Sequence, residues 1–75
     1  MPLIVVKAYP KDEKIKQEIA EEITQVFTEK WGCPREAVTV KIESYAPDVW
    51  QREIKEKEID PHADDCLILE GRQQF

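Results

Sequence analysis

The apolar positions of this chain begin directly after its second residue. Residues 3–6 (LIVV) form an unbroken apolar run that is rich in β-branched side chains. The run predicts a strand over Leu3 to Ala8 with apolar side chains on both faces, which is typical of a strand that is covered on both sides. Pro10 ends this strand in a turn, because proline has no backbone N–H to donate to a neighbouring strand.

The next segment repeats apolar residues at spacings of three and four, which predicts one long amphipathic helix over residues 12–31. The apolar stripe consists of Ile15, Ile19, Ile23, Val26, Phe27 and Trp31. Asp12 is the expected N-cap, and Gly32 followed by Pro34 is the expected stop signal. The opposite face carries mainly lysine, glutamate and glutamine, so it is expected to face solvent.

Residues 37–43 alternate between apolar and polar side chains and predict a second strand. Val38, Val40 and Ile42 form its apolar face. A strand, a helix and a strand joined by short connections predict a βαβ unit with two parallel strands. The apolar stripe of the helix is then expected to cover one face of the sheet.

The C-terminal third of the chain is patterned more weakly. After a loop, Asp48 is placed to cap a short helix over residues 49–54, and Pro61 is expected to break the chain. Residues 66–70 (CLILE) predict a short third strand. Residues 71–75 form a tail for which the pattern favours neither helix nor strand.

Chain length sets the fold class and adds an expectation about assembly. The predicted fold is a single α+β domain over residues 1–75, with a βαβ unit, a short second helix and a C-terminal strand. A domain of this size buries only about 60% of its unfolded surface. The first strand is also apolar on its second face, which no other long helix is available to cover. The sequence therefore predicts a homo-oligomer.

Charge and composition argue against several classes of partner. Sixteen acidic against eleven basic side chains give a net charge of −5, which argues against nucleic acid and against an anionic membrane surface as partners. No apolar run approaches the length of a transmembrane helix. A single histidine and two cysteines without metal-ligand spacing suggest no metal site. No secretory signal is visible, so Cys33 and Cys66 are expected to be free thiols in the cytoplasm.

Pro2 is the candidate for chemistry. Removal of Met1 would leave Pro2 with a secondary amine, and an apolar setting lowers the pKa of an amine by disfavouring its charged form. Such an amine is a usable general base near neutral pH. The plain alternative is that proline, which makes up about 5% of ordinary sequence, is simply tolerated at the start of a strand.

Taken together, these features resemble the 4-oxalocrotonate tautomerase family. The resemblance rests on Pro2 after a removable methionine, the apolar first strand, the long helix, the turn at residues 32–34 (GCP) and the strand at residues 38–40 (VTV). Residues 47–51 (PDVWQ) and 58–61 (EIDP) are similar to the longer, dimeric bacterial branch of that family.

The resemblance implies a fold and a reaction. Two βαβ units would associate so that their strands complete one four-stranded sheet, giving a dimer, with a trimer of dimers as the alternative. Pro2, as a neutral amine, would take a proton from an enol hydroxyl or from the carbon next to a keto group and return it to another carbon. The substrate would be a small-molecule carboxylate, and no cofactor is implied.

The substrate-binding positions depart from the family pattern. Well-known members carry an arginine in the loop after the first strand, where this chain has Lys11, and an arginine on the second strand, where it has Thr39. The aromatic residue of the family pocket falls near Trp50. Arg52 is a further cation that could take a missing role. The predicted site is therefore Pro2 as the catalytic residue, with Lys11, Thr39, Trp50 and Arg52 as substrate-binding candidates.

Two other functions remain open from the sequence. One lies within the superfamily, with Pro2 as the acid or base of a decarboxylase or dehalogenase. The other is a non-catalytic dimerising module that binds a ligand. Retention of Met1 would favour the module, because the nitrogen of Pro2 would then be an amide without a basic lone pair.

Overall fold

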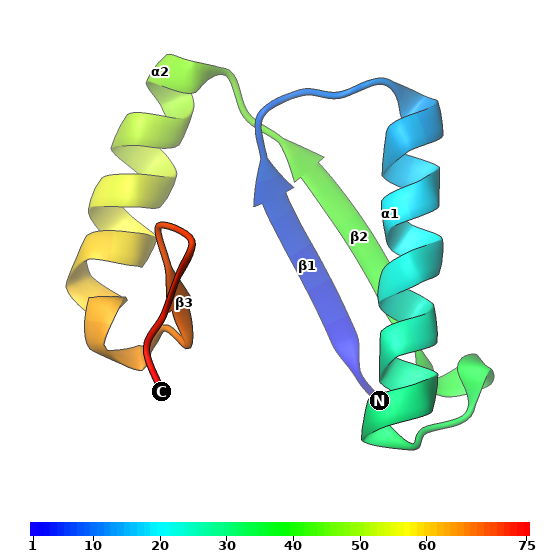
Figure 1. Cartoon of the computed structure of the whole chain (residues 1–75). Coiled ribbons are helices and arrows are strands. Elements are labelled where there is room, and N and C mark those ends of the chain that lie inside the picture. Colours follow the sequence, from blue (N-terminus) through cyan, green and yellow to red (C-terminus); the bar gives the residue numbers. More distant parts are fainter.

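Two parallel strands and a long helix form the N-terminal part of the molecule. The computed structural model describes all residues from Met1 to Phe75. Strand β1 (Leu3–Ala8) pairs in parallel with β2 (Thr39–Ser44), so that Leu3 lies opposite Thr39 and Ala8 opposite Ser44. Helix α1 (Glu13–Val26) runs alongside this sheet (Figure 1). The predicted βαβ unit and its parallel strand pair are confirmed.

The long helix, which consists of α1 and one further turn, is bounded by the two residues that the sequence marked, Asp12 and Gly32. The side chain of Asp12 accepts a hydrogen bond from the backbone N–H of Ile15 at 2.9 Å, which makes it the N-cap. The final turn, Phe27–Trp31, widens into π-helical geometry. Gly32 then takes a left-handed conformation with φ of 83°, which a residue without a Cβ adopts at little cost.

The second strand starts later than the pattern predicted. The prediction placed its start at Ala37, but Arg35–Ala37 form a 3-10 turn and β2 begins at Thr39. The backbone N–H of Ala37 bonds the carbonyl of Pro34 at 3.0 Å, and that of Val38 bonds the carbonyl of Arg35 at 3.1 Å. These amides are used in the turn, so they are not available to extend the strand.

The short second helix is longer than predicted. Helix α2 (Pro47–Val49) continues directly into wider π-helical turns over Trp50–Ile59, and a 3-10 segment over Asp60–Asp65 with a kink at His62 follows. We call the whole of Pro47–Asp65 the second helix. Its N-cap is Ala46 and not Asp48, because Pro47 has the preset φ that suits the first helical position.

The chain is kinked at the predicted break, since His62, directly after Pro61, has non-helical backbone angles (φ −119°, ψ 23°). Pro61 lies in the first turn of the 3-10 segment, where a missing N–H costs no hydrogen bond. The predicted extent of the third strand is wrong. The third strand is only β3 (Ile68–Leu69), and it pairs with β4 (Arg72–Gln73) from the tail. This hairpin lies beside the second helix and forms its own two-stranded sheet (Figure 1).

The core of the single chain is thin. Only Thr24 and Ile54 are buried, whereas the sheet residues facing α1 are half-buried. On the other face of β1, the side chains of Leu3 and Val5 are 65% and 40% exposed. No helix of the structure has the length and apolar character needed to cross a bilayer.

Candidate active site

Pro2 lies at the start of β1, against the segment that leads into β2. Its carbonyl oxygen accepts a hydrogen bond from the backbone N–H of Thr39 at 3.1 Å. The amino group of Met1 donates to the carbonyl of Ala37 at 2.9 Å. Pro2 is half-buried, and its neighbour Thr39 is exposed. The structure thus brings the predicted base and one predicted binding residue together.

Arg35 lies in the 3-10 turn before β2, at the same end of the sheet as Pro2, and its charge is already paired. Arg35 donates two hydrogen bonds to the carboxylate of Glu21 on α1, at 2.9 and 2.8 Å. This contact lowers the pKa of Glu21 and raises the pKa of Arg35, because each charge is stabilised by the other. Pro2 lines neither of the two cavities in the chain.

A cavity of about 450 Å³ lies at the opposite end of β1. It is lined by Lys7, Ala8, Tyr9, Lys11 and Trp50, and we call it the aromatic pocket. The rings of Tyr9 and Trp50 meet edge to face, with centroids 5.6 Å apart and planes at 77°. That geometry is the favoured one for aromatic pairs, so the two rings form a defined apolar wall.

The two lysines of the aromatic pocket differ in their partners. Lys7 donates to both carboxylate oxygens of Glu58 on the second helix, at 2.9 and 2.8 Å. The hydrogen bond to Glu58 raises the pKa of Lys7. Lys11 has no carboxylate within ion-pair distance. The pocket therefore combines an apolar wall, a neutralised lysine and one lysine that is free to bind an anion.

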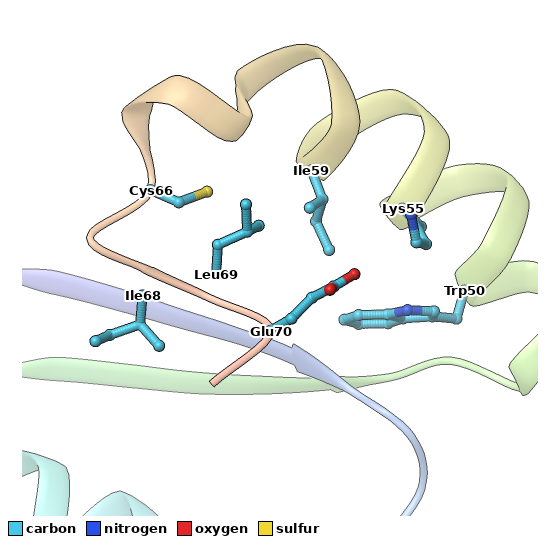
Figure 2. Close-up of a pocket in the computed structure, with 7 residues that line it drawn as sticks. All are labelled: Trp50, Lys55, Ile59, Cys66, Ile68, Leu69 and Glu70. Atoms are coloured by element: carbon cyan, nitrogen blue, oxygen red, sulfur yellow. The ribbon is translucent and has the colours of Figure 1, made fainter. Parts of the chain in front are cut away.

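A second cavity of about 340 Å³ lies between the second helix and the C-terminal hairpin (Figure 2). Its lining consists of Trp50, Lys55, Ile59, Cys66, Ile68, Leu69 and Glu70. Lys55 is paired with Asp60 at 2.9 Å, and Figure 2 shows Glu70 reaching from the hairpin toward the indole ring of Trp50. This cavity is mainly apolar, and it shares Trp50 with the aromatic pocket.

The structure divides the predicted site residues into two groups. Lys11 and Trp50 line the aromatic pocket, whereas Pro2 and Thr39 lie at the other end of β1. A strand rises by roughly 3.3 Å per residue, so the two groups are separated by roughly 20 Å within one chain. Arg52 is exposed on the second helix and lines neither cavity.

Three residues at the aromatic pocket were not identified from the sequence. Lys7 lies two positions after Val5 on the same face of β1, and Tyr9 follows at the same spacing just past the end of the strand at Ala8. That alternation was a usable signal for Lys7 and Tyr9. Glu58 is 51 residues from Lys7 in the chain, and no local pattern marks that contact.

Comparison with known proteins gives the family. The tautomerase enzyme family model matches residues 2–57. Tautomerase PptA of Cronobacter sakazakii is 33% identical over 66 residues, which cover 85% of this chain and 87% of that protein. The residues that the family model matches include the βαβ unit and the start of the second helix. The chain belongs to the tautomerase family.

Proposed function

We propose that the chain is a cofactor-independent tautomerase that shifts the double bond of a small 2-keto or enol carboxylate, with the amine of Pro2 as general base. Membership of the tautomerase family is the observation that carries the reaction type. The position of Pro2, half-buried at the start of an apolar strand, supports its role. The proposal includes the cytoplasm as compartment, where the thiols of Cys33 and Cys66 stay free.

The proposed base exists only after Met1 is removed. With Met1 attached, the nitrogen of Pro2 is an amide and has no basic lone pair. Removal gives a secondary amine on a ring-locked backbone beside apolar side chains. Partial burial lowers the pKa of this amine toward neutrality, where a general base is most effective.

We propose that the working site is completed by a second copy of the chain. Leu3 and Val5 leave an apolar strand face exposed, and a chain with two buried residues has little core of its own. In a two-fold dimer with the sheets side by side and antiparallel, the start of β1 in one copy approaches the end of β1 in the other. Pro2 would then lie near Lys11 and Trp50 of the second copy.

Each residue has a defined role in this arrangement. Lys11 holds the substrate carboxylate, although as a point charge it lacks the two-pronged geometry of an arginine. The wall of Tyr9 and Trp50 excludes water from the reacting carbons. Pro2 removes one proton from the enol hydroxyl or α-carbon, and its ammonium form returns that proton to another carbon. The atoms and electrons balance without a redox step.

The hydroxyl of Thr39 has a smaller proposed role beside the base. Thr39 is exposed next to Pro2, so its hydroxyl is placed to donate a hydrogen bond to bound substrate. Arg52 is exposed on the helix that carries Trp50 and contacts no carboxylate. In the proposal Arg52 acts only as a distant positive charge.

Mixing two inactive variants tests the composite site. Pro2→Ala lacks the base and Lys11→Ala lacks the cation, so each homodimer is expected to be nearly inactive on an enol carboxylate. In an equal mixture that exchanges subunits, half of the dimers are mixed and each has one intact site. About a quarter of the wild-type activity should then return.

The same mixture separates the parts of the proposal. No recovery from subunits that are shown by mass spectrometry to have exchanged would overturn the composite site. Full activity of correctly processed Pro2→Ala would overturn the base. Sedimentation of wild type as a stable folded monomer at micromolar concentration would overturn the dimer.

A further inference from the structure

We propose that Glu58 sets the charge of the aromatic pocket: by holding Lys7 it leaves Lys11 as the one free cation, and so selects a substrate with one carboxylate over a substrate with two. This inference rests on the proposed function of the pocket, and it adds a residue that selects the substrate. Glu58 itself lies on the second helix and touches the pocket through Lys7.

Lys7 and Glu58 form an ion pair with two hydrogen bonds. Lys7 reaches from β1 to both carboxylate oxygens of Glu58, at 2.9 and 2.8 Å. The two side chains are 31% and 48% exposed, so the pair lies at the edge of the pocket and is not buried. An incoming anion therefore meets a neutral pair at this position and a full positive charge at Lys11.

A second substrate carboxylate has no free partner in such a pocket. To bind Lys7 it would have to displace Glu58, and it would then meet the negative charge of Glu58 at short range. Lys7 stays protonated at neutral pH, since the hydrogen bond to Glu58 raises its pKa. Removing the charge of Glu58 therefore turns Lys7 into a second cation that is available to substrate.

No other acidic group is placed to replace Glu58. Glu43 on β2 is the other carboxylate near Lys7, but it already accepts hydrogen bonds from Lys41 at 3.0 Å and from the hydroxyl of Tyr45 at 2.9 Å. These two contacts lower the pKa of Glu43 and occupy both of its carboxylate oxygens. Glu58 therefore mainly determines whether the positive charge of Lys7 is available to a ligand.

Glu58 also lies two helical turns beyond Trp50, so the ion pair holds the second helix against β1 near the aromatic wall. A purely structural role would make every ligand bind more weakly when the pair is lost. A role in charge selection instead changes the ratio of affinities for ligands with one and with two carboxylates. The ratio is thus the quantity to measure.

The test compares benzoate with isophthalate, which share one ring and differ by one carboxylate. Binding to the full, Met1-processed chain is followed by NMR at the indole N–H of Trp50. Wild type should bind benzoate at least as tightly as isophthalate. Glu58→Gln, which keeps the size and removes the charge, should bind isophthalate about threefold to tenfold more tightly and leave benzoate nearly unchanged.

Two further variants serve as controls. Glu21→Gln removes a carboxylate from the comparable two-oxygen pair with Arg35, which lies away from the pocket, and it should alter neither affinity. The double variant Lys7→Gln with Glu58→Gln should lose the gain for isophthalate. If Glu58→Gln does not fold, Glu58→Asp, which shortens the arm, should give a smaller gain in the same direction.

The inference is overturned if Glu58→Gln changes both affinities by the same factor, or if isophthalate binding does not improve. Because binding is measured without turnover, the result does not depend on catalysis. Pro2-dependent turnover without a change in the affinity ratio would sink the role of Glu58 alone. A change in the ratio in a chain that shows no turnover would sink the proposed reaction alone.

Discussion

The two ends of β1 differ in almost every property that matters for proton transfer. At its start, Pro2 lies among backbone hydrogen bonds, with no cavity and no free cation beside it. At its end, the aromatic pocket offers two rings and a free Lys11, but no group with the character of a general base. Each end lacks what the other supplies.

This division has a physical consequence for the base. A neighbouring positive charge disfavours the protonated form of an amine and so lowers its pKa. In the proposed dimer, Lys11 of the second copy would therefore both hold the substrate and help to keep Pro2 neutral. A single chain provides neither effect, because roughly 20 Å of strand separates the two groups.

The largest expected effect is at the start of β1. Pro2→Ala keeps an amine but changes its basicity and geometry, and loss of a general base costs about 10² to 10⁴ in rate. The measurement is a spectrophotometric assay on enol and keto acids, with Met1 removal verified by mass. Thr39→Val, at the same end, serves as the control and should change the rate far less. Equal losses in both variants would mean that this end acts through its structure and not through the amine.

The next effect separates the two candidate cations at the other end. Lys11→Ala should cost about 1.5 to 3 kcal/mol, or roughly 10- to 150-fold in kcat/KM, because it removes a charge-assisted hydrogen bond to the carboxylate. Arg52→Ala removes an exposed charge outside both cavities and should do little. Loss mainly through KM would indicate carboxylate holding, and loss through kcat would indicate stabilisation of the enolate. A larger loss in Arg52→Ala would reverse the assignment.

The ends of the long helix were easier to predict from sequence than the aromatic pocket, because the signals for a helix end are local. The N-cap at Asp12 and the stop at Gly32 each depend on residues within one helical turn, and both predictions are confirmed. The start of β2 was misplaced because the turn at Arg35 uses amides that the apolar alternation had assigned to a strand. The periodicity of apolar side chains does not show which acceptor a backbone N–H bonds.

The aromatic pocket depends on contacts between distant parts of the chain. Trp50 was proposed from the family resemblance, but its partner Tyr9 is 41 positions away in the chain, and no local pattern marks their contact. Residues 55–58 (KEKE) alternate in charge, and only the fold shows that Glu58 is paired with Lys7.

A smaller effect is expected from the aromatic wall. Trp50→Leu loses the edge-to-face contact with Tyr9, and such a contact contributes about 0.5 to 1.5 kcal/mol beyond its buried area. KM should rise by about two- to tenfold, because the substrate loses an ordered apolar surface. Trp31→Leu is the matched control, since Trp31 is 74% exposed and lines neither cavity. An equal rise in both variants would contradict a specific role for the wall.

The smallest effect concerns one ion pair from each region, and the two pairs should respond to opposite ends of the pH scale. Arg35 lowers the pKa of Glu21 below its ordinary value of 4.5, so this pair stabilises the fold above that pH and the stabilisation is lost as pH falls. Glu58 raises the pKa of Lys7 above 10.5, so that pair is fully effective below pH 10.5 and is lost as pH rises further. Both pairs are solvent-exposed, so both effects are small and weaken with salt. In urea unfolding at fixed protein concentration, the difference between wild type and Glu21→Gln should vanish in acid and persist in alkali, whereas the difference between wild type and Lys7→Gln should vanish in strong alkali. A difference for Lys7→Gln that persisted unchanged in strong alkali would show that the contact does not depend on the charge of Lys7, and the contrast between the two pairs would be wrong.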